Sequence, residues 1–364
     1  MLFYWVIFII VFFCAFGKTP QKRKLKFLLS AGLLCIIGCT RAMSVGMDVT
    51  GYCNTYLELN SATYSVLLEK FEPGFLMSMS SFKYFGIKDP MLYIYFCFIV
   101  FWLCNLNFIK KYTDYSGFAV FLIYSMGYYF GAFNTVRQML CHAIILCFIP
   151  LLQQQKYKKY IILTIVTALL FHKSQVAMLL CLFPFVAPIR LQKEFFLYLY
   201  LIGSIILAIF ILPKLSAALT ILSLYVNNST YSGYLMDTTT LGDLSISNLA
   251  MHSLYIAIVV YFSSRSNISS ISKKFLVISV LGQALSNLLS PVSWILARVT
   301  DSLTYFRIVP ISELFFNKKT RNRWIFQLIT LAYFIVRFYG RLKRDGVGDD
   351  GDVIPYVSIF ANLF

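Results

Sequence analysis

The sequence predicts an all-α, polytopic integral membrane protein with about twelve transmembrane helices, and three observations support this prediction. Hydrophobic residues make up 59% of the 364 residues and charged residues only 13%, at a mean hydropathy of +0.74, whereas soluble domains carry about 25% charged residues. Apolar runs recur along the chain, and many approach the ~20 residues that a helix needs to cross a bilayer. Lysine and arginine gather between these runs. Because a helix satisfies its own backbone groups in lipid, the runs are predicted to be helical spans.

Twelve runs are assigned as spans in chain order. The first, residues 2–17, has no basic segment before it and no small-residue cleavage site after it, so it is predicted to be a retained span and not a signal peptide. The second, fifth and sixth runs are short. The predicted spans cover residues 2–17, 25–40, 91–109, 116–133, 138–152, 160–172, 174–189, 195–212, 248–262, 274–290, 302–316 and 324–340. Together they predict one polytopic membrane domain over residues 1–364.

Two segments outside the spans, 41–90 and 213–247, are long enough to be more than turns. In the first, apolar residues recur at helical spacing over residues 64–85, which predicts helices that lie along the membrane interface. The second is rich in Ser, Thr, Asn, Tyr and Gly. That composition suits sugar binding, and it suits a solvated loop equally well.

The distribution of charge explains the formal net charge of +17 without nucleic acid. If the N-terminus lies outside, the loops that face the cytoplasm, with Lys274 at a span edge, hold 19 of the 32 lysines and arginines, but only Asp114 and Glu194 among the acids. This is the asymmetry of the positive-inside rule. The positive-inside rule predicts that both long segments, 41–90 and 213–247, lie on the outer face. The predicted partner is the lipid bilayer, and no nucleic acid is predicted to bind.

The nine cysteines and the acidic residues do not predict a metal site. Eight of the cysteines fall within apolar runs and form no CxxC pair, so they are read as small hydrophobic residues. Cys53 lies in an outer segment without an evident partner. The acidic stretch 345–352 is read as a solvated loop and not as a cation site. We therefore predict no disulfide, no metal and no cofactor.

Several polar motifs interrupt the apolar pattern at the predicted outer ends of spans. On a helix, Asn134, Arg137, Gln138 and Cys141 share one face. Arg137 is read as a contact for an anionic ligand, because an ionised group near hydrocarbon costs roughly 2.5–3.5 kcal/mol and needs a partner. The alternative is an arginine that extends its charge to the interface.

Two further motifs lie at predicted outer positions. His172, Lys173 and Ser174 occupy a tight turn between two spans, where a lone histidine is more often structural, but the polar neighbours favour a site. Arg298, Asp301 and Tyr305 share one helical face. An Arg298–Asp301 pair that only neutralises charge is the alternative interpretation.

Another motif follows the second span, where Arg41, Gly46, Asp48 and Tyr52 form the pattern Arg-x4-Gly-x-Asp-x3-Tyr, and Glu72-Pro73-Gly74 comes later in the same segment. With the three motifs above and the terminal Ile354-Pro355-Tyr356, this pattern resembles the EpsG-type polysaccharide polymerases, relatives of the Wzy O-antigen polymerases. The match runs in order over nearly the whole chain.

The resemblance implies a bacterial inner-membrane enzyme with a GT-C-like helical bundle and an active site that faces the periplasm. Such an enzyme joins oligosaccharide repeats carried on undecaprenyl diphosphate, so the implied partners are a lipid-linked donor, a lipid-linked acceptor and a chain-length regulator. The resemblance implies O-antigen or exopolysaccharide as the product. A flippase or exporter of lipid-linked sugar is an alternative, as is a ligase that transfers the finished glycan.

Roles follow from the chemistry of this reaction. Negative charge grows on the departing diphosphate, so Arg137 and Arg298, with Arg41 as a third contact, are assigned to stabilise it. His172 is a candidate general base or diphosphate contact, and Asp48 is the alternative base. The remaining candidates for substrate binding are polar or aromatic neighbours of these groups in the same motifs: Tyr52, Asn134, Gln138, Ser174 and Tyr305.

Overall fold

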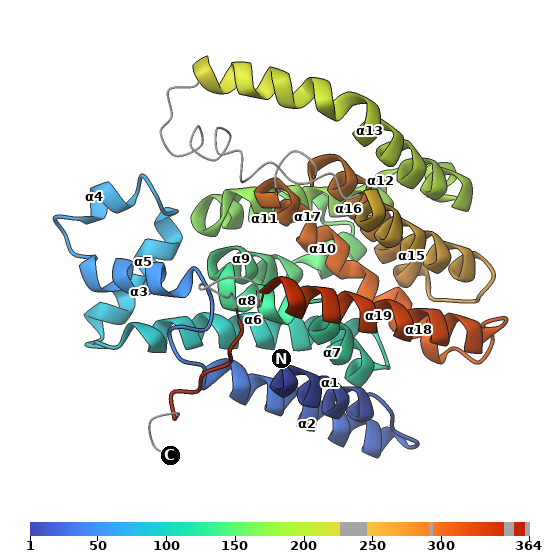
Figure 1. The fold of residues 1–364 in the computed structure, drawn as a ribbon, viewed down its shortest axis with the longest axis horizontal. Coiled ribbons are helices and arrows are strands. Elements are labelled where there is room, and N and C mark those ends of the chain that lie inside the picture. Colours follow the sequence, from blue (N-terminus) through green and yellow to red (C-terminus); the bar gives the residue numbers. More distant parts are fainter. Residues whose placement is uncertain (226–245, 291–293, 346–352, 361–364) are drawn as a thin grey trace. The chain divides into compact units, whose positions relative to one another are not determined.

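The computed structural model describes residues 1–225, 246–290, 294–345 and 353–360, and every regular element within these ranges is a helix (Figure 1). This confirms the all-α prediction for the described residues. The elements are α1 (Leu2–Cys14), α2 (Pro20–Cys39), α3 (Val49–Glu58), α4 (Tyr64–Leu67), α5 (Pro73–Tyr84), α6 (Pro90–Tyr112), α7 (Ser116–Ser125), α8 (Tyr128–Asn134), α9 (Val136–Leu146), α10 (Ile149–Gln153), α11 (Tyr157–Phe171), η1 (Lys173–Leu182), α12 (Phe183–Val186), η2 (Ile189–Gln192), α13 (Glu194–Tyr225), α15 (Ile246–Ser264), α16 (Ser270–Leu289), α17 (Trp294–Thr304), η4 (Tyr305–Arg307), α18 (Ile308–Phe316) and α19 (Arg323–Asp345).

Each of the twelve predicted spans coincides with a helix or a group of short helices, but fewer meet the requirements of a membrane crossing. Among the described residues, three helical segments are long and apolar enough to cross a membrane: Pro90–Tyr112, Val136–Gln153 and Arg323–Lys343. The pair α7 and α8, bent by 54°, makes a fourth if the two helices form one broken span. The chain is therefore a membrane protein with at least three candidate spans, and the number twelve stays a prediction.

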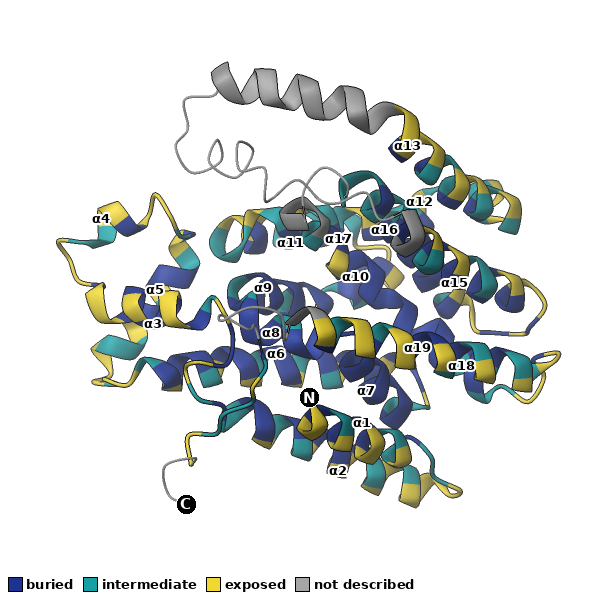
Figure 2. Ribbon diagram, viewed as in Figure 1, coloured by how far each residue is buried: buried dark blue, intermediate teal, exposed yellow. Residues whose placement is uncertain are grey.

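The chain divides into two compact units. Unit 1 comprises residues 1–176 and 327–364, and unit 2 comprises residues 177–326. In unit 1, α7 packs against α1, α2 and α6, and its residues 117–125 are all buried (Figure 2). Phe8 and Phe338 contact each other in this core, and Phe121 packs on Phe8. Aromatic contacts thus join the first and last helices of unit 1 around α7.

The break between α7 and α8 occurs at Gly127, which has a positive φ of 87°. A helix that breaks inside a membrane leaves backbone groups without their helical partners. The carbonyl of Met126 accepts a hydrogen bond of 3.4 Å from Nε of Arg337 on α19. Arg337, which the sequence places inside a predicted span, therefore compensates one group that the break releases.

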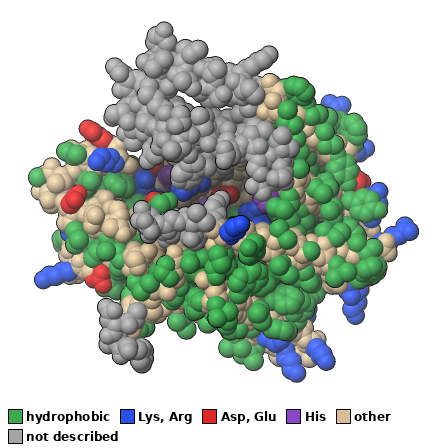
Figure 3. Space-filling view, in the orientation of Figure 1, with side chains coloured by type: hydrophobic (Ala, Val, Ile, Leu, Met, Phe, Trp, Pro, Cys, Tyr) green, Lys and Arg blue, Asp and Glu red, His purple; other side chains and the backbone are tan. Residues whose placement is uncertain are grey.

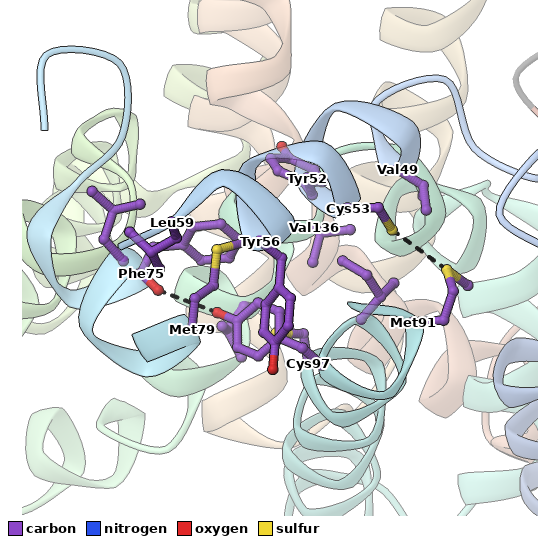
Figure 4. Close-up of a cluster of buried hydrophobic side chains, with 14 of the residues drawn as sticks. Val49, Tyr52, Cys53, Tyr56, Leu59, Phe75, Met79, Met91, Cys97 and Val136 are labelled. Carbon is purple, nitrogen blue, oxygen red and sulfur yellow. Dashed lines mark hydrogen bonds between the residues drawn. The ribbon is translucent and has the colours of Figure 1, made fainter. Parts of the chain in front are cut away.

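The segment 41–90, predicted to lie on the outer face, forms the helices α3, α4 and α5. Side chains of α3 and α5 pack on the N-terminal half of α6. The core of this segment is a cluster of buried side chains that includes Tyr52, Tyr56 and Phe75 (Figure 4). Tyr93 of α6 belongs to the same cluster. The hydroxyl groups of Tyr93 and Ser78 lie 2.6 Å apart and form a hydrogen bond at this cluster. This predicted interfacial segment is thus a packed helical layer.

In unit 2, α16 is the central helix and packs against α13, α15 and α17. A Cβ atom added to Gly282 would lie 2.6 Å from Cβ of Leu303, so the glycine permits this close approach. The amide of Asn287 donates to the hydroxyls of Ser204 and Ser253, each at 2.9 Å, and its oxygen accepts from Gln283 at 3.0 Å. One asparagine on α16 therefore links three helices.

Replacing Asn287 with alanine is expected to lower the stability of unit 2 by about 1–2 kcal/mol, because hydrogen bonds between helices in membranes are worth roughly this much. The matched control is Asn267→Ala, since Asn267 is exposed and its removal should cost less than about 0.5 kcal/mol. Thermal unfolding of the purified proteins in detergent measures both. Equal midpoints for the two variants would contradict the role of Asn287.

Hydrophobic side chains also cover much of the surface of unit 1. Leu2, Val6 and Phe13 of α1 and Leu328 and Val336 of α19 are all exposed. In the space-filling view, hydrophobic side chains form a broad area over these helices, with lysines and arginines at its margins (Figure 3). Such a large apolar surface is expected where helices face lipid.

Candidate active site

A single carboxylate brings together three of the polar motifs in unit 1. Oε2 of Glu72 lies 2.5 Å from Nη1 of Arg137, and its Oε1 lies 3.3 Å from Nδ1 of His172. The backbone N–H of Lys173 also donates to Oε1, at 3.3 Å. Positions 72, 137 and 172 are far apart in the sequence, yet their side chains meet at the start of α5, the start of α9 and the end of α11.

The Glu72-Pro73-Gly74 motif accounts for the position of the carboxylate. Glu72 is the N-cap of α5 with extended backbone angles, and Pro73 occupies the first helical turn, where its fixed φ is favourable. A Cβ atom on Gly74 would lie 2.7 Å from the carbonyl oxygen of Leu170. Because Gly74 lacks that atom, the start of α5 packs directly against the last turn of α11, next to His172.

Arg137 enters the cluster from the first turn of α9. Asn134 is instead the last residue of α8, because the helix breaks at Thr135, so the single helical face predicted for Asn134 and Arg137 is interrupted there. The guanidinium of Arg137 lies over the ring of Phe71, with Cζ 4.7 Å from the ring centroid, and within 6 Å of Tyr52 and Phe75. Contacts of this kind between a guanidinium and aromatic rings are attractive. Tyr52, predicted as a substrate contact, therefore supports Arg137.

Glu72 is held in its ionised form. Burial raises the pKa of Glu72, but the contact with His172 and the charge of Arg137 lower it by more, and the net result is a pKa of about 2. Since the folded-state pKa is lowered, the stabilisation from the ionised carboxylate is complete above the unfolded pKa near 4.5 and is lost only as pH falls toward 2. The contacts of Glu72 with Arg137 therefore persist throughout the physiological pH range.

His172 ends α11 in an extended conformation, with φ of −165° and ψ of 107°. Its backbone carbonyl lies 4.0 Å from Sγ of Cys141 on α9. Nδ1 is buried and lies close to Oε1 of Glu72 without forming an aligned hydrogen bond in the described residues, while 26% of the side chain remains exposed, as does 19% of Arg137. Both groups are thus fixed on Glu72 and still accessible to a ligand. Within the described residues, the buried Oγ of Ser174 has no hydrogen-bond partner.

The loop after α2 packs on the helix break next to Arg137. Gly46 has a φ of +117°, and a Cβ atom there would lie 2.4 Å from the carbonyl oxygen of Phe133. Oδ1 of Asn134 accepts a hydrogen bond of 3.2 Å from the backbone N–H of Met47. Asn134 therefore holds this loop, which leads through Asp48, the half-buried N-cap of α3.

Arg41 is fully buried, although the sequence predicts it as a third ligand contact. Its guanidinium stacks on Phe133 at 4.2 Å, and its Nη1 donates to the carbonyl of Gly38. Nε and Nη2 are buried without a hydrogen-bond partner in the described part of the chain. Burial lowers the pKa of Arg41 to about 10, which leaves the group positively charged at neutral pH.

The terminal motif returns to this place. Residues 41 and 358 form an antiparallel bridge, and the hydroxyl of Tyr356 lies 3.0 Å from that of Thr40. Tyr356 also stacks on Phe3. The first and last motifs of the sequence are therefore neighbours in unit 1.

A model of the EpsG family matches residues 24–358. The chain belongs to the EpsG family. Comparisons with curated proteins and with solved structures gave no match. The matched range includes every motif from Arg41 to Tyr356, and it confirms the family that the order of the motifs predicts. EpsG proteins are polymerases of the glycosyltransferase type, so membership supports an enzymatic role in polysaccharide biosynthesis.

The EpsG motifs are divided between the two units. Arg298 lies half-buried on α17 and Tyr305 is buried in η4, both in unit 2. Their assignment to the active site stays a prediction from the sequence. Gln138 is buried on α9 in unit 1, one residue after Arg137.

Glu72 is the residue to which sequence reasoning assigned no role. The signal was present, because Glu72-Pro73-Gly74 is one of the motifs that carry the family resemblance. A motif does not show which distant residues its carboxylate contacts, however, and the structure supplies that information. The partly exposed guanidinium of Arg137 carries a fixed positive charge at this cluster, which suits an anionic ligand such as a phosphate.

Proposed function

We propose that this protein polymerises oligosaccharide repeats carried on undecaprenyl diphosphate, at the periplasmic face of a bacterial inner membrane. The observation that carries the proposal is the cluster in which Glu72 holds Arg137 and His172 at one end of the unit 1 helices. Membership in the EpsG family supports the reaction class. We further propose that the remaining helices complete about twelve crossings of the membrane.

The charges at the two ends of unit 1 support a periplasmic site. α9 begins and α11 ends at the Glu72 cluster, so the connection from α10 to α11 lies at the opposite end. That end carries Lys110 and Lys111, because the hydroxyl of Tyr112 donates to Gln153 at 3.0 Å. The connection itself contributes the lysines at positions 156, 158 and 159. Under the positive-inside rule this end faces the cytoplasm, and the cluster faces outward.

The proposed reaction is a glycosyl transfer. A hydroxyl of the acceptor repeat attacks the anomeric carbon of the donor glycan and forms a new carbon–oxygen bond. The bond from that carbon to the phosphate oxygen breaks, and its electron pair leaves with the polyprenyl diphosphate. Arg137 stabilises the negative charge that grows there, because a fixed guanidinium interacts more strongly with the transition state than with the ground state. His172 accepts the proton of the hydroxyl and releases it to water.

The other predicted residues take different parts in this proposal. The burial of Arg41 favours a supporting role beneath the site, where it fastens the loop that contains Gly46. Asn134 and Tyr52 position that loop and Arg137. Asp48 remains the alternative base, and Arg298 and Tyr305 remain candidates from the sequence. The proposal needs no metal and no cofactor, because arginine carries the diphosphate.

Purified protein incubated with a defined undecaprenyl-diphosphate repeat tests the function directly. We expect a ladder of polymer without other enzymes and without added metal. A single addition to each acceptor would indicate a ligase, and transfer of intact lipid between the leaflets of a vesicle without new glycosidic bonds would indicate a flippase. Either result would contradict the proposal.

A further inference from the structure

We propose that Glu72 is a positioning residue that sets the protonation of the His172 ring, so that Nε2 presents a lone pair to the acceptor hydroxyl. The proposal rests on the proposed function and deepens it. It assigns a task to a residue that takes no direct part in the glycosyl transfer, and it favours His172 over Asp48 as the base.

Nδ1 of His172 lies 3.3 Å from Oε1 of Glu72. A neutral imidazole carries a proton on one nitrogen and a lone pair on the other, whereas an ionised carboxylate only accepts hydrogen bonds. Two lone pairs facing each other at this distance would repel, so we place the proton on Nδ1. The lone pair then resides on Nε2, the nitrogen on the other side of the ring.

Glu72 remains an anion and is not itself the base. Its partners are Arg137 and the backbone N–H of Lys173, and only 9% of its side chain is exposed. A carboxylate that is satisfied by several donors accepts another proton poorly. Its remaining capacity is to orient His172 and to stabilise the positive ring that forms when His172 takes up a proton.

The Glu72 carboxylate is held in place with respect to the His172 ring. The absence of a Cβ atom at Gly74 lets α5 meet the carbonyl of Leu170, two residues before His172. The hydrogen bond from Lys173 to Glu72 fixes the residue that follows His172. The residues on both sides of the histidine therefore contact the segment that carries Glu72, one through the Gly74 backbone and one through the Glu72 carboxylate.

The charged and titratable groups near His172 lie on α5, on α9 and next to it in the chain. Glu72 faces it from the start of α5, Arg137 lies across the same carboxylate on α9, and Cys141 of α9 contacts its backbone carbonyl. Lys173 follows in the chain. Removal of the negative charge of Glu72 leaves positive neighbours, so the protonated ring becomes less stable.

The test is Glu72→Gln in the purified full-length protein, which keeps the shape of the side chain and removes its charge. We expect kcat for polymer formation to fall about 100-fold, since the loss of a group that orients a base commonly has this effect. We also expect the acid limb of the kcat profile to move to lower pH, because the carboxylate charge that faces the ring is gone. A purely structural role would lower the yield of folded protein and would not move the acid limb.

Two variants serve as controls. Glu69→Gln removes an exposed carboxylate three residues earlier and should behave as wild type. Glu72→Asp keeps the charge and should recover part of the rate, with the acid limb near its wild-type position. If Glu72→Gln does not fold, Glu72→Asp carries the test, and its shorter side chain should lower kcat about 10-fold.

The outcome separates the two proposals. If the wild-type protein forms no polymer, the proposed function fails. If the wild type forms polymer, and the folded Glu72→Gln variant, or Glu72→Asp in its place, keeps the wild-type kcat and pH profile, the positioning role of Glu72 is wrong and the proposed function stands.

Discussion

Replacement of Arg137 by alanine is expected to lower polymer formation by about 10²- to 10³-fold, the usual cost of losing one donor that stabilises a developing negative charge. Arg137 lies over Phe71 and is paired with Glu72, so its position is fixed before any ligand binds. A group that needs no rearrangement during the reaction stabilises the transition state most. The measurement is the initial rate of repeat addition by purified protein, with glycan length examined on gels.

Arg137→Lys distinguishes charge from geometry at this position. Lysine keeps the positive charge but lacks the planar group that both stacks on an aromatic ring and donates in parallel to a phosphate. We therefore expect a loss between those of alanine and wild type.

Arg265→Ala is the matched control for both Arg137 variants. Arg265 also pairs with a glutamate, Glu194, but 44% of its side chain is exposed, and exposed pairs contribute little. If the Arg137→Ala variant forms polymer as fast as the Arg265→Ala variant, the assignment of Arg137 to the active site is wrong.

The second large effect is expected at Gly46. Gly46→Ala should destabilise the protein by about 2–4 kcal/mol, because alanine is strained at positive φ and its Cβ would overlap the carbonyl oxygen of Phe133. The overlap is with backbone at the end of α8, which cannot turn aside as a flexible side chain does. Thermal unfolding in detergent and the yield of folded protein in membranes measure the effect.

Gly51→Ala provides a control five residues away in the same segment. Gly51 lies exposed in α3, has nothing within 4 Å of an added Cβ, and is helical. Alanine should therefore stabilise this helix by about 0.5–1 kcal/mol. If both glycine variants change stability equally, the close contact between the Gly46 loop and α8 is not important to the fold.

The helical class and the approximate positions of the helices could be predicted from the sequence because apolar runs have a length and composition that few other structures share. Hydropathy does not predict where an apolar run is divided into two or more helices. Residues 116–133 form two helices bent at Gly127, and residues 302–316 are divided among α17, η4 and α18. Such breaks depend on tertiary partners, as Arg337 and the carbonyl of Met126 show.

The candidate site was predictable in part. Arg137 and His172 were selected because charged or titratable groups at the ends of apolar runs need partners, and in unit 1 both contact the same carboxylate. The same reasoning applies to Arg41, which is fully buried beside the terminal segment. A buried arginine and a partly exposed one have the same appearance in a sequence.

Sequence patterns are sufficient to predict a helical membrane protein of the EpsG type, with its positive charge gathered between the apolar runs. Composition, hydropathy and the order of short motifs are local properties of a chain, and they can be read without knowing which segments meet. The contacts of Glu72 with Arg137 and His172, and the return of residues 353–360 to Arg41, become visible only in the folded chain. Those contacts depend on how helices far apart in the sequence pack, and their geometry gives each charged group its partner.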